Sequence, residues 1–297
     1  MKIKPKLAVS FLLLCLAPLA VSGFVSSTMA ERALTMQVLH QLESVATIQK
    51  SRLEDIFDQN RERLRLIATR TQLRRSLAAF LSRRDPALAA EMNAILADSL
   101  TAVAGFKEIT VLDPAGLAVA GTEPAHLGLG HAGAPHFERG RAGPCVDLFF
   151  LDGAGRLRCR LSGPLVWEDR LVGVVLVDAA AENVTDLAAD YSGLGRSGET
   201  LLARPDGPGQ GMYIAPLRFD PEAALRRSVD MAAGDRPMAA ALEGREALLP
   251  DALDYRGRRV LAATRFLPAN NLGLVVKLDR DEAFAPMVEL RHTLMLV

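Results

Sequence analysis

The sequence predicts an α+β protein in which a long N-terminal helix precedes two tandem antiparallel-sheet modules, flanked by membrane helices. Three observations lead to this prediction: apolar segments at both ends, a run without glycine or proline over residues 31–82, and an order of strands and helices that repeats after residue 193. At 297 residues the chain is long enough for roughly two domains, each with its own core.

The composition excludes several classes of protein. Lys+Arg and Asp+Glu both number 35, so the chain lacks the excess positive charge of a nucleic-acid-binding protein. With 24% charged and 49% hydrophobic residues it is neither a disordered nor a polytopic membrane protein. Three cysteines without a Cys-x-x-Cys pair predict no disulfide scaffold and no metal or redox site, and no cofactor is expected. Cys145 and Cys159 flank a predicted hairpin turn, and either a disulfide or two separate core residues fits.

The N-terminal segment, residues 1–30, is predicted to be a transmembrane helix or an uncleaved signal anchor. Lys2, Lys4 and Lys6 precede an uncharged stretch over residues 7–30. A helix of that length measures about 36 Å, enough to cross the hydrocarbon core. Lysines on this flank hold the N-terminus in the cytoplasm and send the following residues outside. A signal peptide cleaved after Ala30 is the alternative.

The C-terminal segment, residues 286–297, is interpreted as the start of a second, truncated transmembrane helix. Its last four residues are apolar, and the sequence stops in the middle of the pattern. A short amphipathic helix at the end of a folded domain is the alternative.

Residues 31–104 are expected to form a long stalk and dimerisation helix followed by a second helix, which begins at Asp85-Pro86. Apolar and amide side chains of the long helix recur at steps of three and four, as an amphipathic helix requires. Such a stripe needs a partner, either a folded domain or its copy in a dimer, and we expect a homodimer. The stripe comprises Val38, Leu42, Val45, Gln49, Leu53, Ile56, Asn60, Leu64 and Ile67.

Residues 105–192 are predicted to form a membrane-distal module, and residues 193–285 a membrane-proximal one. Alternating polarity and turn residues predict their elements. The first module is expected to have strands at 106–112, 117–119, 146–151, 156–161, 164–166 and 171–177, a loop at 121–143 and a helix at 179–191. The second is expected to have strands at 200–203, 253–256, 260–266 and 273–278, and helices opened by Asp220 and Pro237.

Four stretches carry a resemblance to a known family. They are Gly-Leu-Gly-Arg-Ser-Gly-Glu-Thr-Leu-Leu at residues 193–202, Val-Leu-Asp-Pro-Ala-Gly at 111–116, His136-Phe137, and residues 272–284. In this order the chain resembles the double Cache (dCache) extracytoplasmic sensor domains of bacterial transmembrane signalling receptors. The resemblance implies two PAS-like Cache modules, with a ligand pocket in the first. It also implies an output module beyond residue 297: a histidine kinase, a diguanylate cyclase or phosphodiesterase, or a chemoreceptor.

The ligand-binding candidates lie in the first module. Four of them belong to an expected lid over residues 131–141, namely His136, Phe137, Arg139 and Arg141. A further aromatic wall is expected from Phe149.

Two arginines and one aspartate complete the candidate site. Arg158 and Arg160 share one face of a predicted strand, where a guanidinium suits bidentate carboxylate binding, although both facing solvent is the alternative. Asp178 stands where amino-acid-binding members of the family have an aspartate, or it caps the following helix. The lid lacks the family's Arg-x-Trp-Tyr run, so amino-acid recognition does not carry over.

These features predict the small-molecule-sensing region of a two-pass transmembrane receptor, placed in the inner membrane with its sensor in the periplasm. The expected ligand is a small organic anion, such as a carboxylate. No nucleophile elbow, P-loop, dinucleotide fingerprint or zinc spacing is present in the sequence, so no enzymatic activity is expected. The alternative is a secreted or membrane-anchored binding or adaptor protein without catalytic output.

Overall fold

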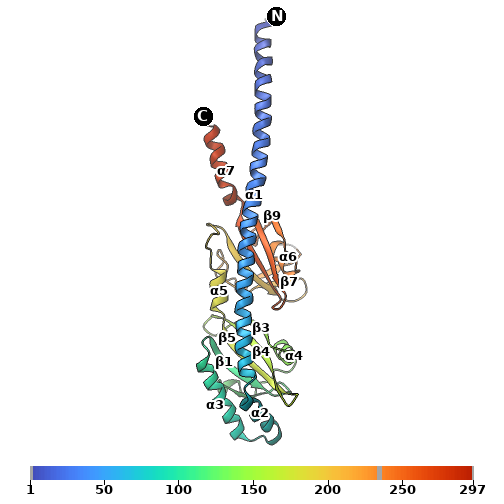
Figure 1. Ribbon diagram of the computed structural model, residues 1–297, viewed down its shortest axis with the longest axis vertical. Coiled ribbons are helices and arrows are strands. Elements are labelled where there is room, and N and C mark those ends of the chain that lie inside the picture. Colours follow the sequence, from blue (N-terminus) through green and yellow to red (C-terminus); the bar gives the residue numbers. More distant parts are fainter. Residues whose placement is uncertain (1–2, 233–235, 296–297) are drawn as a thin grey trace.

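The computed structural model describes residues 3–232 and 236–295. One helix, α1 (Ile3–Ala68), runs along both sheet-containing modules, and the N- and C-terminal ends lie at the same end of the elongated molecule (Figure 1). The predicted α+β fold, with a long helix followed by two tandem antiparallel sheets, is confirmed.

Most side chains of the two predicted membrane segments, residues 1–30 and 286–297, lie outside the described part of the structure. Within the described part, no helix combines the length and the apolar character that a membrane crossing needs. Both segments therefore stay predictions.

The long helix ends earlier than the sequence predicts. It ends at Ala68, and Arg70 takes an extended conformation with φ −60° and ψ 111° before α2 (Thr71–Arg83) begins. The break is stabilised by Arg74 of α2, which donates hydrogen bonds to the carbonyl groups of Thr69 and Val166. It lets α2 turn onto the strands of the first module. No glycine or proline marks this break in the sequence.

The next helix, α3 (Pro86–Ala102), begins as predicted. Its N-cap is Asp85, whose side chain accepts a hydrogen bond from the Ala87 backbone N–H at 2.9 Å, with Pro86 at the first helical position. Figure 1 shows α2 and α3 at the end of the molecule that is farthest from the termini.

The first module is built on a five-stranded antiparallel sheet in the order β2-β1-β5-β4-β3. Its strands are β1 (Phe106–Leu112), β2 (Ala118–Gly121), β3 (Cys145–Leu151), β4 (Leu157–Trp167) and β5 (Arg170–Ala180). The two predicted strands at 156–161 and 164–166 are one strand. Since β3 pairs with β4 only as far as Ser162, Pro164 lies where β4 is open on one side, and such a position tolerates a proline.

Short helices occupy segments of the first module that the sequence assigns differently. The expected loop at 121–143 contains the 3-10 helix η1 (Pro124–His126) and α4 (Pro135–Ala142). The expected helix at 179–191 is only α5 (Glu182–Ala188), because β5 continues to Ala180.

The second module is built on a six-stranded sheet in the order β8-β7-β6-β11-β10-β9. Its strands are β6 (Glu199–Pro205), β7 (Gln210–Tyr213), β8 (Ser228–Asp230), β9 (Leu248–Leu253), β10 (Arg259–Leu267) and β11 (Leu272–Asp279). The helix expected at Pro237 is α6 (Arg236–Leu242), and α7 (Arg280–Met295) follows β11 directly. The helix expected at Asp220 is instead a series of turns, in which Leu225 has a positive φ of 56° and donates its N–H to the Tyr213 carbonyl.

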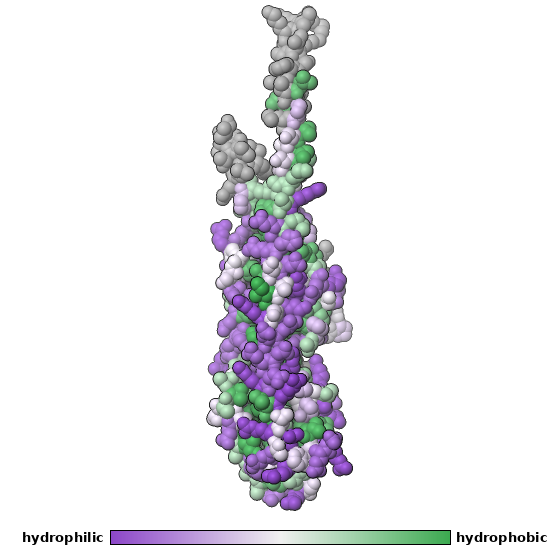
Figure 2. Space-filling model, in the orientation of Figure 1, coloured by the Kyte–Doolittle hydropathy of each residue, from purple (hydrophilic) through white to green (hydrophobic). Residues whose placement is uncertain are grey.

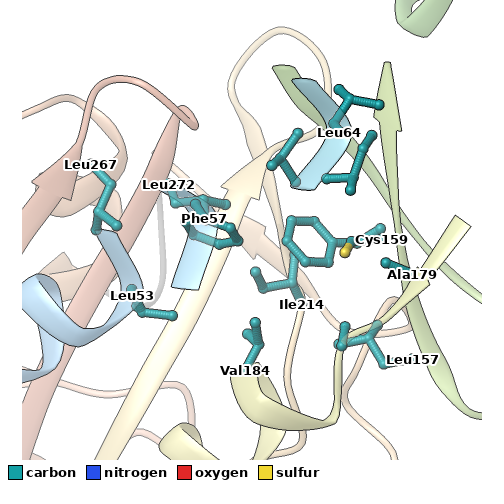
Figure 3. Packing of buried hydrophobic residues seen from close by; sticks show 14 of the residues in the cluster. Leu53, Phe57, Leu64, Leu157, Cys159, Ala179, Val184, Ile214, Leu267 and Leu272 are labelled. Carbon is teal, nitrogen blue, oxygen red and sulfur yellow. The ribbon is translucent and has the colours of Figure 1, made fainter. Parts of the chain in front are cut away.

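Both sheets pack on the same stripe of α1. Phe57 is fully buried between Leu267 and Leu272 of the second module and Leu157 and Cys159 of the first (Figure 3). Most of the stripe that the sequence assigns to a dimer interface therefore packs against the modules of the same chain. Its buried members are Leu42, Gln49, Leu53, Asn60, Leu64 and Ile67.

The two cysteines of the first module are not bonded to each other. Cys145 lies opposite Ser162 across β3 and β4, with its Sγ 3.1 Å from the serine Oγ. Cys159 lies opposite Phe149 and is buried among apolar residues, so the alternative of two separate residues is correct.

Candidate ligand site

A polar row crosses the first sheet on the face turned away from α1. Glu108 on β1 lies opposite Asp178 on β5, which lies opposite Arg160 on β4. The adjacent residues Val177 and Leu161 belong to the core that packs on α1. Because side chains alternate along a strand, the row points to the opposite face, beneath α4 and the loop before it.

Arg160 and Asp178 form a bidentate ion pair. The Nε and Nη2 of Arg160 donate to the two carboxylate oxygens of Asp178, both at 2.6 Å. The guanidinium also lies 5.3 Å from the ring centroid of Phe150. The bond to Asp178 raises the pKa of Arg160, and the pair fixes the guanidinium in the site.

A second charged pair forms where η1 approaches β1. The Nδ1 of His126 lies 2.6 Å from Oε1 of Glu108, which also accepts a hydrogen bond from Thr110 Oγ1 at 3.2 Å. The hydrogen bond to Glu108 raises the pKa of His126 and therefore favours the charged imidazolium.

A pair of histidines, His131 in the loop before α4 and His136 in the first turn of α4, lies above this row. Nδ1 of His131 and Nε2 of His136 are 3.0 Å apart, and the rings meet edge to face. Burial, followed by the positive charge of Arg160, lowers the pKa of both, that of His136 to about 4. Both imidazoles are therefore neutral at neutral pH, so that one ring nitrogen donates and the other accepts.

These residues enclose a cavity of about 160 Å³. The loop above it is held down at Gly116, which has a φ of +85°, accepts a hydrogen bond from the His131 N–H and leaves no room for a Cβ against Ala132. Drug-sized pockets measure about 300–1,000 Å³, so this cavity suits a ligand of few non-hydrogen atoms. The lining residues are Glu108, Thr110, His126, Leu129, His131, Arg160, Leu176 and Asp178.

Two of the eight sequence-predicted residues, Arg160 and Asp178, line this cavity, and His136 supports it through His131. Asp178 does not cap the following helix, because the N-cap of α5 is Ala181. Phe137 lies on the buried side of α4, in an apolar cluster that includes Leu176.

The other predicted residues lie elsewhere. Phe149 points to the opposite face, where its ring packs edge-on against Phe57 of α1. Arg139 and Arg141 are exposed on α4, and Arg141 lies 3.4 Å from Glu138.

Arg158 lies outside the cavity as well, but it does not face solvent. It is 3% exposed, and its guanidinium pairs with Asp152 at 2.8 Å and with Glu182 at 3.1 Å. The alternative that Arg158 and Arg160 both face solvent is therefore wrong.

Several residues that line the cavity are not among the sequence-predicted site residues. Glu108 and Thr110 lie two residues apart on β1, as Leu176 and Asp178 do on β5, so each pair shares one face of the sheet. Strand periodicity therefore places Leu176 on the same face as the candidate Asp178. No local signal marks His126, because only the path of the loop brings it to Glu108.

Comparison with known proteins identifies the fold. No family model and no curated protein sequence matches the chain. Among solved structures, the sensory domain of the Campylobacter jejuni chemoreceptor Tlp3 matches with a TM-score of 0.62 and 12% identity over 86% of this chain and 99% of that one. The chain has the double Cache sensor-domain fold. A second match is the sensor domain of the V. cholerae histidine kinase DctB, with a TM-score of 0.58 and 15% identity over 82% of this chain and 98% of that one.

Proposed function

We propose that this double Cache chain is the extracytoplasmic small-molecule-sensing region of a two-pass transmembrane receptor in the inner membrane. The main support for this proposal is the cavity in the first module, which is lined by two charged pairs above an otherwise packed sheet. Its output would be a histidine kinase, a cyclic-dinucleotide enzyme or a chemotaxis module, and the matched sensory domains belong to a chemoreceptor and a histidine kinase.

The arrangement of the ends supports two-pass topology. The N-terminal part of α1 and the helix α7 leave the second module at the same end of the molecule (Figure 1). Apolar side chains are exposed along this part of α1, while polar side chains predominate on the visible face of the modules (Figure 2). Val21, Phe24 and Met29 are all more than 60% exposed. Exposed apolar residues along a helix suit a lipid environment.

The proposed ligand is a small organic acid, zwitterionic acids included. Arg160 and the charged His126 offer donors to a carboxylate, while Glu108 and Asp178 offer acceptors to a cationic group. A ligand carboxylate would share Arg160 with Asp178, and such charged contacts are strongest in a desolvated pocket. Tlp3 has been crystallised with isoleucine and with L-norvaline, which carry both kinds of group.

Calorimetric titration of the purified chain with small organic and amino acids tests this proposal. For a ligand that binds, Arg160→Ala is expected to weaken affinity at least about tenfold, as loss of a charge-assisted contact does. Arg141→Ala is the matched control, because this arginine is exposed on α4 outside the cavity, and it should leave affinity unchanged. Equal affinity in wild type and Arg160→Ala would place the ligand elsewhere. Reporters fused after Lys6 and Asp178 should lie on opposite sides of the membrane.

We also propose a homodimer, through a different face of α1 from the stripe that the sequence indicated. Val45 and Ile56 are half-buried against the chain's own core, whereas Ile48 is 53% exposed. Ile48→Asp should lower the mass measured by light scattering to that of a monomer. An unchanged dimer mass would exclude this face.

A further inference from the structure

The second sheet carries a charged cluster at a place that corresponds to the ligand site of the first. Lys277 lies near the end of β11 and pairs in register with Glu199 at the start of β6, as Asp178 near the end of β5 pairs with Glu108 near the start of β1. Val275, two residues before Lys277, belongs to the apolar cluster on the face away from α1. Both modules therefore place one cation among carboxylates on the same face of the sheet.

The two places differ in whether they are open. In the first module the charged row borders a cavity. In the second, the side chains of Lys277, Glu199 and Asp254 are completely buried, and the lysine ammonium occupies the centre of the cluster.

The ammonium is bound as a ligand would be. Its Nζ lies 2.7 Å from Oε1 of Glu199 and 2.6 Å from Oδ2 of Asp254. The rings of Tyr255 and Phe219 complete the enclosure, with centroids 5.3 and 5.9 Å from Nζ. Two carboxylates and aromatic faces are the groups that recognise an alkylammonium ion.

The carboxylates are positioned without help from the lysine. Glu199 accepts hydrogen bonds from the Tyr255 hydroxyl at 2.9 Å and from the Arg218 backbone N–H at 2.9 Å. Asp254 accepts from the side chain of Arg256 at 2.8 Å and from two backbone N–H groups of its own turn. Burial and the Glu199 carboxylate raise the pKa of Tyr255, so its hydroxyl stays a donor. The site is therefore preorganised for a cation.

We propose that the second module contains a binding site for a primary alkylammonium group and that Lys277 of the chain itself permanently fills it. The occupied site is connected to the helix that leaves the module, because Arg256 bridges Asp254 and Asp279 and α7 begins at the next residue, Arg280. The internal cation thus holds the start of α7. If the proposed sensing function is correct, an external molecule binds in the first module and not in the second. The proposed ammonium site does not depend on that function.

Chemical rescue of Lys277→Ala in the full 297-residue chain tests the proposal. Alanine keeps Cβ and removes the equivalent of propylammonium. Thermal unfolding is followed with increasing propylammonium chloride, and with sodium and tetramethylammonium chloride at equal ionic strength. We expect the variant to unfold at a lower temperature than wild type, and propylammonium alone to restore part of the loss with a saturable dose response.

Two controls separate occupation of the site from general salt effects. Lys50→Ala removes a lysine that pairs with Glu246 at the surface, and neither this variant nor wild type should respond to propylammonium beyond the sodium control. If Lys277→Ala does not fold in sodium buffer, the refolding yield with propylammonium becomes the readout. Equal effects of propylammonium and sodium, on unfolding temperature or on yield, would overturn the proposal.

Discussion

Because of the histidine pair in the first module, we expect the protein to lose stability as the pH is lowered. One substitution in the pair should reduce this loss. Burial, the charge of Arg160 and the neighbouring His131 lower the pKa of His136 from 6.5 to about 4. The other charged groups facing the pair are Asp178, Glu108, His126 and Arg139. Between these two pKa values the unfolded chain binds a proton that the folded chain does not, so stability is present above pH 6.5 and falls as the pH is lowered towards 4.

The size of the effect follows from the two pKa values. At about pH 5 the unfolded imidazole is mostly charged and the folded one mostly neutral, so about 2 kcal/mol of stability is lost between pH 7.5 and pH 5, out of about 3.4 kcal/mol for the full shift. Partial exposure and the coupling to His131 reduce the expected contribution to about 1–2 kcal/mol. The raised pKa of His126 acts in the opposite direction, because its stabilisation is present below pH 6.5 and is lost as the pH rises.

Urea unfolding of wild type and His136→Gln, measured between about pH 7.5 and pH 5, isolates the contribution of His136 to the pH dependence of stability. Glutamine keeps one donor and one acceptor near His131 but does not titrate. The loss of unfolding free energy on acidification should be smaller in His136→Gln by about 1–2 kcal/mol. His40→Gln, at an exposed position of α1, is the control and should retain the wild-type dependence. An identical pH dependence in His136→Gln and wild type would refute the reasoning.

Two packing predictions concern the framework of the site. Phe57→Ala removes a fully buried ring between both modules and should lower the unfolding free energy in urea by about 3–5 kcal/mol, whereas Leu66→Ala, 69% exposed on the same helix, should change it by less than about 0.5 kcal/mol. A Cβ at Gly173 would lie 2.2 Å from the Leu112 carbonyl oxygen, so Gly173→Ala should destabilise the first sheet by about 1–3 kcal/mol. Gly153→Ala, with open space around it, is the control. Full stability of Phe57→Ala or Gly173→Ala would contradict the packing described.

Features that depend on neighbours in the chain could be predicted without the structure. The cap and proline at Asp85-Pro86 mark the start of α3, and the amphipathic stripe of α1 marks which side is buried, because both signals depend on helix geometry alone. The alternation of residues 156–161 places Arg160 on one face of β4 for the same reason.

Features that depend on strand register and packing required the tertiary structure. Arg158 and Arg160 have the same parity on β4, but register places Arg158 opposite Ala180 and Arg160 opposite Asp178, so only Arg160 reaches the cavity. Likewise α1 ends before Arg70 although no glycine or proline lies there, because a separate α2 can cover the strands of the first module. Local periodicity determines which face a side chain occupies, and the free energy of packing between distant segments decides what that face meets.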